Sequence, residues 1–183
     1  MSTLYLIRHG KTEANLRHAY CGSTDLPLSP QGREALESLH YDIHPDRIVT
    51  SGMKRTEQTL SLLFGDLPHE KNPELREIDF GVFEMHTYEE LKDRADYQAW
   101  ISGDNEANVP PEGESGNAMT ARVLKAIRPM LEGDGSTLVV THGGVIAAIM
   151  AELFKDENKY RYQWQPQPGY GYAIQDGTYR PIP

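Results

Sequence analysis

Short apolar runs alternate with amphipathic stretches along much of the chain. The runs at 4–7, 47–50 and 138–141 are each four residues long and end in polar residues, which is typical of buried strands. Stretches of helical length follow these runs. This repeated order of strand and helix predicts an α/β fold, with three α/β/α layers and a mostly parallel central sheet.

Four helices are predicted around this sheet. The first begins after Ser29-Pro30, because serine is a favoured N-cap and proline is favoured at the first helical position. The other three span 53–64, 117–132 and 145–154. The last of these is apolar and follows the clearest of the predicted strands.

Residues 85–117 interrupt this alternation. They contain short helical pieces around 87–101, followed by a segment over 105–116 that is rich in Gly, Pro and Glu. We expect an insertion that covers the carboxyl ends of the strands, where open α/β sheets bind their ligands. Within it, Trp100 is the aromatic residue that we expect to contact a ring of the ligand.

The tail over 160–183 is rich in aromatic residues. Packing of their rings on a strand at the sheet edge is the favoured interpretation, and a dimer contact or a stacking platform for a base are the alternatives. The tail residues concerned are Tyr160, Tyr162, Trp164, Tyr170, Tyr172 and Tyr179.

Length and composition limit the class of protein. The 183 residues suffice for a single domain over 1–183. With 18 basic and 27 acidic side chains the formal charge is −9, which opposes nonspecific binding of nucleic acid. No apolar run approaches the roughly 20 residues that span a bilayer, no export leader precedes Leu4, and Cys21 has no second cysteine to pair with. We therefore expect a cytoplasmic protein with neither nucleic acid nor a membrane as partner.

The charge is distributed unevenly along the chain. Residues 1–60 contain seven basic and seven acidic side chains, whereas residues 61–160 contain nine and 19. The acidic surplus therefore lies in the middle of the chain, and the first 60 residues are the expected place for binding an anion.

Polar side chains suited to phosphate chemistry follow three of the predicted strands. The strand ends are Arg8-His9-Gly10, Ser51-Gly52 with Arg55 one helical turn later, and His142-Gly143. Parallel strands bring their carboxyl ends to one edge of the sheet, so these groups are expected to converge there. Two guanidiniums and two imidazoles suit phosphoryl transfer, because arginine pairs with phosphate oxygens and a neutral histidine can attack phosphorus.

Each of these residues alone has a simpler interpretation. A single Arg-His-Gly sequence occurs by chance, His142 alone is more typical of a hydrogen-bonded residue near the core, and Arg55 alone is typical of a helix surface. Their occurrence at three strand ends in one chain is what favours a functional site.

With these residues in this order, the sequence resembles the histidine phosphatase superfamily, which includes cofactor-dependent phosphoglycerate mutases and small phosphatases. The resemblance spans nearly the whole chain and rests on the order and spacing of several motifs. They are Arg8-His9-Gly10-Lys11-Thr12-Glu13-Ala14-Asn15, the segment over 22–32, Ser51 to Thr59, Leu75-Arg76-Glu77 with Gly81 and Glu84, the segment over 111–115, and Val140-Thr141-His142-Gly143-Gly144.

The resemblance implies a role for each matched position. His9 would be the nucleophile that becomes phosphohistidine, and Glu77 would be the proton donor to the leaving oxygen. The groups that would bind the phosphoryl group, several of which also take part in catalysis, are Arg8, Asn15, Arg55, His142 and the backbone N–H of Gly143. The mechanism implies neither a metal nor a cofactor.

Two further features bear on the site. Many family members carry Trp-Glu-Gly after the proton-donor motif, whereas this chain has Phe83-Glu84-Met85, so we expect an altered turn into the insertion. His18 either flanks the mouth of the pocket with Arg17 and Tyr20 or is an ordinary loop residue. Because His9 must be unprotonated and Glu77 protonated, we expect a bell-shaped pH dependence.

The leading hypothesis is a metal-independent phosphomonoesterase that acts on a small phosphorylated metabolite. The chain looks most like the small phosphatases of the family, including those for α-ribazole-5'-phosphate. A cofactor-dependent phosphoglycerate mutase is one alternative, although such mutases are usually longer, and a domain that binds a phosphoryl ligand without turnover is another. Both a monomer and a homodimer remain compatible with the sequence.

Overall fold

The apolar runs of the sequence form the parallel part of the sheet. The computed structural model describes residues 1–183 and contains six strands in the order β3-β2-β4-β1-β5-β6. Strands β1 (Ser2–Arg8), β2 (Arg47–Thr50) and β4 (Gly135–Thr141) run parallel with the short β3 (Glu70–Lys71). The predicted strands β1, β2 and β4 thus end at the same edge, as the alternation predicted.

The tail supplies the other two strands. Strand β5 (Gly171–Gln175) pairs antiparallel with β1, and β6 (Thr178–Ile182) pairs antiparallel with β5, so the sheet is mixed. The prediction that tail aromatics pack on a strand at the sheet edge is confirmed for Tyr172 and Tyr179, which lie in these strands. Tyr160 and Tyr162 lie outside them and are exposed.

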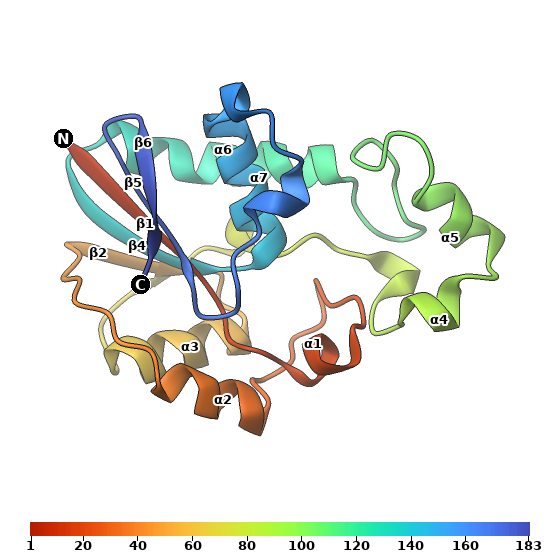
Figure 1. The fold of residues 1–183 in the computed structure, drawn as a ribbon, viewed down its shortest axis with the longest axis horizontal. Coiled ribbons are helices and arrows are strands. Elements are labelled where there is room, and N and C mark those ends of the chain that lie inside the picture. The colour runs from red at the N-terminus through yellow and green to blue at the C-terminus, as the bar shows by residue number, and fades with distance from the viewer.

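Helices cover both faces of the sheet, which confirms the three layers (Figure 1). On one face lie α2 (Pro30–Glu37) and α3 (Lys54–Phe64), and on the other lie α6 (Gly116–Glu132) and α7 (Gly143–Leu153). The larger core cluster joins α6 and α7 to the sheet, and a smaller one lies on the α3 side. Hydrophobic burial therefore holds the strand ends in fixed relative positions.

Several element boundaries differ from the predicted ones, among them the starts of α7 and β4. Helix α7 begins at Gly143, two residues before the predicted start, because the apolar pattern begins only at Val145. Strand β4 begins at Gly135 rather than 138, because its polar first residues pair with β1 in the register Ser2↔Gly135. In both cases backbone hydrogen bonding extends the element beyond its apolar part.

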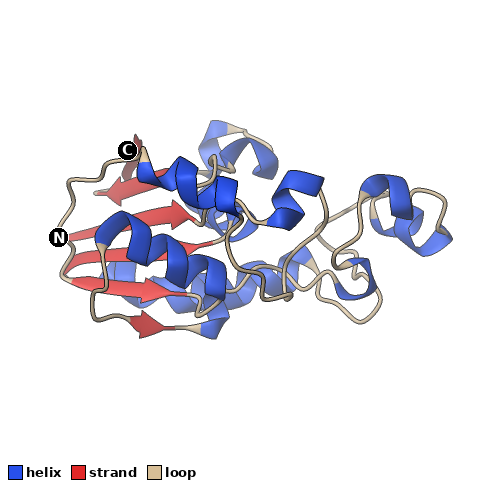
Figure 2. Cartoon of the chain, turned by 90° about the horizontal axis from the view of Figure 1, so that it is seen from below, coloured by secondary structure: helices blue, strands red, loops and turns tan.

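The segment predicted as an insertion extends past the carboxyl ends of the parallel strands. Figure 2 shows its helices α4 (Tyr88–Leu91) and α5 (Ala95–Trp100) beyond the end of the sheet to which these strands point. A separate apolar cluster, centred on Phe83, Leu91 and Tyr97, stabilises it. The insertion contacts the loop after β1 through a bridge between Ala19 and Thr87.

Short helices complete the fold. Helix α1 (Glu13–Arg17) follows β1, and the 3-10 turns η1 (Pro73–Leu75) and η2 (Gly81–Phe83) lie between β3 and the insertion. The turns η3 (Lys155–Glu157) and η4 (Arg161–Trp164) connect α7 to β5. No helix is long and apolar enough to cross a membrane.

The turn into the insertion has the backbone conformation that favours glycine. Met85 adopts φ +66°, and its N–H donates to the carbonyl of Tyr20 at 2.6 Å. A side chain in this left-handed region costs roughly 1–2 kcal/mol. The missing glycine of the Phe83-Glu84-Met85 sequence therefore appears as local strain at Met85.

Candidate active site

His9 lies directly after β1 and is held in one orientation. Its ring is 5% exposed, and Nδ1 lies 2.6 Å from the carbonyl oxygen of Gly10. Because a carbonyl only accepts, Nδ1 carries the hydrogen and Nε2 keeps its lone pair. Burial, and then the charges of Arg55 and Arg8, hold the pKa of His9 well below its ordinary value, even though the bond to Gly10 acts in the opposite direction. The ring is therefore neutral at neutral pH, and the lone pair of its Nε2 is available for reaction.

His142 follows β4 and faces His9. The two ring centroids are 5.1 Å apart. The Nε2 atom of His142 is 2.8 Å from the hydroxyl of Ser51, and Nδ1 is buried with no hydrogen-bond partner in the protein. Burial and then Arg55 lower the pKa of His142 well below its usual range. When Ser51 donates to Nε2, the Nδ1–H of the neutral ring is left to donate to an anion beside His9.

Two arginines surround the histidine pair. Arg55 is 1% exposed and donates to the carbonyls of Gly22 and Thr24, both at 2.8 Å. Arg8 donates to the carbonyl of Pro166 at 2.8 Å, and its buried Nε has no partner. Both guanidiniums thus have fixed positions and donors still available, which is the arrangement that binds phosphate oxygens.

The loop that holds Arg55 is itself fixed by Glu84. One carboxylate oxygen of Glu84 accepts from the N–H of Thr24 at 2.8 Å, and both oxygens accept from the N–H of Gly22 at 2.9 and 3.0 Å. The hydroxyl of Ser23 also donates to it. The glutamate of the resemblance motif therefore positions the carbonyls to which Arg55 is bonded.

Glu77 lies opposite the arginines at the N-terminal end of α7. Its Oε2 accepts from the N–H of Gly144 at 2.9 Å, and its Oε1 accepts from the N–H of Ile78 at 3.0 Å. Burial raises the pKa of Glu77 above its usual value, and the two backbone bonds and the arginines only partly offset this. The carboxyl is therefore biased toward its protonated form, as a proton donor requires.

The glycines after His142 permit these close approaches. A side chain on Gly143 would place its Cβ 2.8 Å from Nε of Arg8, and one on Gly144 would place it 2.5 Å from Oε1 of Glu77. Gly143 is the first residue of α7, so its N–H has no intrahelical acceptor. It is available to bind an anion, as the resemblance implied.

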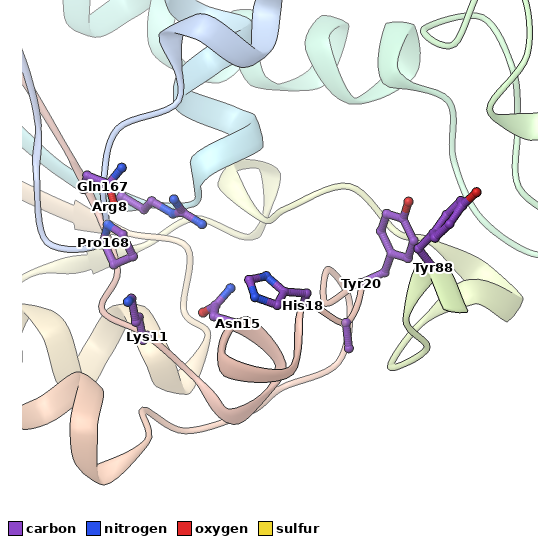
Figure 3. Close-up of a pocket in the computed structure, with 9 residues that line it drawn as sticks. Arg8, Lys11, Asn15, His18, Tyr20, Tyr88, Gln167 and Pro168 are labelled. Atoms are coloured by element: carbon purple, nitrogen blue, oxygen red, sulfur yellow. The ribbon is translucent and has the colours of Figure 1, made fainter. Parts of the chain in front are cut away.

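A cavity of about 490 Å³ opens on the Arg8 side of the site (Figure 3). Asn15 lines it, and its Oδ1 accepts from the N–H of Thr12 at 2.9 Å, so that its amide NH₂ remains available as a donor. Lys11 and His18 line the same cavity, which supports the interpretation of His18 as a residue at the mouth of the pocket. The walls of this Arg8 cavity carry cations and no carboxylate.

A second cavity, of about 840 Å³, opens on the Glu77 side. Its walls come from the insertion, from α6 and α7, and from η4 of the tail. Trp100 lines it, and Asp104 and Glu106 add carboxylates. This Glu77 cavity lies where the leaving group of a bound phosphate ester would be protonated.

The structure brings together the five residues proposed for catalysis, Arg8, His9, Arg55, Glu77 and His142. Sequence reasoning missed the parts that orient them. Ser51 appeared only as the end of a strand, although its position in the Ser51 to Thr59 motif was a signal. No sequence pattern marked the tail residues Pro166 and Gln167 as part of the site. The fold of the tail brings the carbonyl of Pro166 to Arg8 and places Gln167 in the wall of the Arg8 cavity. No three His, Cys, Asp or Glu side chains are grouped as metal ligands.

Comparison with known proteins agrees with this geometry. Residues 4–170 match the family model of the histidine phosphatase superfamily (branch 1). The chain is 35% identical over 159 residues to the adenosylcobalamin/alpha-ribazole phosphatase of Escherichia coli, covering 82% of this chain and 78% of that protein. The crystal structure of the alpha-ribazole phosphatase from Shigella flexneri superposes with a TM-score of 0.84 at 30% identity, covering 98% and 95% of the two chains. The 2,3-bisphosphoglycerate-dependent phosphoglycerate mutase of Cytophaga hutchinsonii is 31% identical over 169 residues, covering 85% of this chain and 78% of the mutase.

The chain belongs to the histidine phosphatase superfamily, so the resemblance stated from the motifs is confirmed. Its relatives also confirm the expected activity class, a hydrolase of phosphomonoesters.

Proposed function

We propose that this hydrolase works through a phosphohistidine at His9, with Glu77 as the acid and then the base. The Nε2 lone pair of His9 attacks phosphorus, and the bond between phosphorus and the ester oxygen breaks. Glu77 gives its proton to that oxygen, so the alcohol leaves neutral. Water then attacks the phosphohistidine, Glu77 takes a proton from it, and inorganic phosphate is released.

The remaining groups stabilise the charge on the transferred phosphoryl group. Its three equatorial oxygens gain charge in the transition state, so fixed donors around them lower the barrier. In this proposal Arg8, Arg55 and His142 supply the side-chain donors, and Asn15 and the N–H of Gly143 complete the set. Each of these donors is held in place by the protein before the substrate binds.

One observation carries the proposal. Two buried polar atoms, Nε of Arg8 and Nδ1 of His142, have no partner in the protein; the ring of His142 faces the neutral ring of His9, and Nε of Arg8 lies close to Gly143. Leaving a buried donor unpaired costs roughly 1–3 kcal/mol. Such unpaired donors at a nucleophile are typical of an anion-binding active site, where the substrate completes the hydrogen bonds.

We further propose α-ribazole-5'-phosphate as the substrate, since both phosphatases compared above carry its name. The mutase alternative is less supported. A mutase handles a molecule with two phosphates or with a phosphate and a carboxylate, whereas the Glu77 cavity carries the carboxylate of Asp104, and its Glu106 is paired with Arg161. A second anion on the leaving group would be repelled there. The acidic insertion also predicts poor activity on phosphoproteins with acidic flanks and on nucleic acid ends.

The test is to trap the intermediate. A ³²P-labelled phosphate ester is mixed with the protein, quenched in alkali and mapped, and the label is expected on His9 in an acid-labile linkage. His9→Ala should lose the label and several orders of magnitude in rate. His44→Ala changes an exposed histidine on a distant turn and is the matched control. Binding of phosphate esters by both proteins, without turnover by either, would instead establish a binding domain.

The proposal also covers the substrate class, the cellular compartment and the domain organisation. The substrate is a small phosphorylated metabolite, the compartment is the cytoplasm, and residues 1–183 act as one domain in which 85–117 cover the substrate. Incubation with 3-phosphoglycerate and a trace of its bisphosphate separates hydrolysis from mutase activity, because a mutase would yield 2-phosphoglycerate. Sedimentation distinguishes a monomer from a homodimer.

A further inference from the structure

Two tyrosines of the tail are exposed at the edge of the Glu77 cavity. Tyr160 and Tyr162 are each 72% exposed, and both line the cavity. Their rings are stacked, with centroids 5.9 Å apart and planes 8° from parallel. Large aromatic rings that are exposed together on a protein surface are typical of binding sites rather than of packing.

The segment over 160–165, here named the tyrosine arm, has a rigid base. Trp164 is 1% exposed and packs against Tyr172 and Tyr179 of the sheet, and the hydroxyl of Tyr172 donates to its carbonyl at 2.7 Å. The ammonium of Lys159 lies 4.2 Å from the centroid of the Trp164 ring. The exposed rings therefore project from a fixed support and keep their position without help from a ligand.

Two more aromatic rings line the same cavity, one from the insertion and one from the segment before it. Phe80 and Trp100 line it, with ring centroids 6.0 Å apart. Tyr20 packs against both, at 5.0 and 5.4 Å. This wall is thus as well supported as the tyrosine arm, and aromatic rings enter the cavity from two segments that are far apart in the sequence.

An ion pair ties the two segments together. Arg161 of the tyrosine arm pairs with Glu106 of the insertion. Glu106 packs against Gly116 at the start of α6, where a Cβ would lie 2.0 Å from its carboxylate oxygen, so a larger residue there would displace this carboxylate. With Arg161 neutralised by Glu106 and Glu77 biased toward its protonated form, the remaining charge of the cavity is the carboxylate of Asp104. A cavity of this charge favours an uncharged group and disfavours an anion.

We propose that Tyr160 and Tyr162 are specificity-determining residues that stack on a planar, uncharged aromatic ring of the leaving alcohol. The inference rests on the proposed function, because Glu77 of the same cavity is the group that protonates the alcohol. Stacking on tyrosine needs only a planar π-face on the ligand. It strengthens binding by about tenfold or more per ring. The contact is remote from phosphorus, so it lowers KM and leaves kcat nearly unchanged.

The experiment compares an ester that has a planar aromatic ring with one that has a puckered saturated ring. They are 2-naphthylmethyl phosphate and its fully saturated analogue, which have the same kind of leaving alcohol and similar size. For the wild type, KM is expected to be about tenfold lower for the aromatic ester. The double variant Tyr160→Leu/Tyr162→Leu should raise KM about tenfold for the aromatic ester alone, with kcat unchanged.

Two control variants test whether the effect comes from the aromatic rings of Tyr160 and Tyr162. Tyr160→Phe/Tyr162→Phe keeps both rings and is expected to restore the wild-type preference. Tyr170→Leu removes an exposed tail tyrosine that does not line the cavity, and should behave as wild type.

The inference is overturned if the leucine variant leaves both KM values unchanged or raises them equally. Hydrolysis of the saturated ester reports the proposed function separately. If the wild type hydrolyses neither ester, the proposed function fails and the inference fails with it.

Discussion

Replacing Glu77 by glutamine tests the assignment of the proton donor. Both oxygens of Glu77 accept backbone hydrogen bonds, from Gly144 at 2.9 Å and from Ile78 at 3.0 Å. Glutamine has the same shape but only one acceptor oxygen, so its NH₂ must face one of these N–H groups. The substitution is therefore expected to cost roughly 1–3 kcal/mol of stability, which must be measured alongside the rate.

The loss of activity depends on the leaving group. General acid catalysis contributes about 10²–10⁴ in rate when the leaving oxygen needs a proton. Glu77→Gln should therefore lower kcat about 10²–10⁴-fold for an alkyl phosphate and far less for 4-nitrophenyl phosphate, whose anion leaves unaided. Glu74→Gln changes an exposed glutamate of η1 and is the matched control.

The pH profile provides the sharper measurement. Activity needs Glu77 protonated, so it falls as pH rises through the raised pKa of this carboxyl. It also needs His9 unprotonated, so it falls as pH drops through the lowered pKa of that ring. The raised pKa of Glu77 and the lowered pKa of His9 both widen the pH range in which the two groups are in the required states. Ionisation of the ester phosphate, near pH ~6, affects both enzymes and cancels in their ratio.

The ratio of wild-type to Glu77→Gln rates should consequently decline with rising pH for the alkyl ester, because only the wild type loses its acid. A ratio that is constant from pH 4 to 9 would refute the assignment of Glu77. Equal losses for the alkyl and nitrophenyl esters would show that the variant damages the phosphate site rather than proton transfer.

Three other expectations follow from the same geometry. Ser51→Ala leaves Nε2 of His142 unpaired, so kcat/KM should fall by the equivalent of about 1–3 kcal/mol in steady-state assays, while Ser38→Ala on the surface changes nothing. Met85→Gly relieves a left-handed residue and should raise the free energy of unfolding in urea by up to about 1 kcal/mol. Because the pKa of His142 is lowered on folding, the unfolded chain binds a proton that the folded protein excludes. Stability should therefore fall as pH drops below about 6.5, and less steeply in His142→Gln.

The sheet and the catalytic centre were predictable because their signals are local. An apolar run such as 138–141 must be buried, and the residue that follows it must lie at the edge of the sheet. His9 and His142 each follow such a run, so the parallel order of β1 and β4 brings them together. Element boundaries were less accurate, because hydrogen bonding continues where the apolar pattern stops.

The orientation of the catalytic groups was not predictable in the same way. The proton on Nδ1 of His9 is placed by a neighbouring carbonyl, and the Arg8 side chain is held by Pro166, which is 158 residues away in the sequence. Because every residue has a carbonyl, no sequence pattern indicates which carbonyl will bind a catalytic side chain. The tail aromatics show the same limit, since Tyr172 and Tyr160 look alike in the sequence but one lies in a strand and the other is exposed.

The uneven distribution of charge along the chain corresponds to a difference in charge between the two cavities. The Arg8 cavity takes Arg8, Lys11 and Asn15 from the first 60 residues, whereas Asp104 and Glu106 in the Glu77 cavity come from the acidic middle segment. A phosphate ester that binds across the site therefore meets cations at its phosphate and, at its alcohol, the carboxylate of Asp104 and the ion pair of Glu106 with Arg161. This polarity selects substrates with a single anionic end, and it disfavours bisphosphates more strongly than any steric limit would, because the Glu77 cavity of about 840 Å³ has room for a second phosphate.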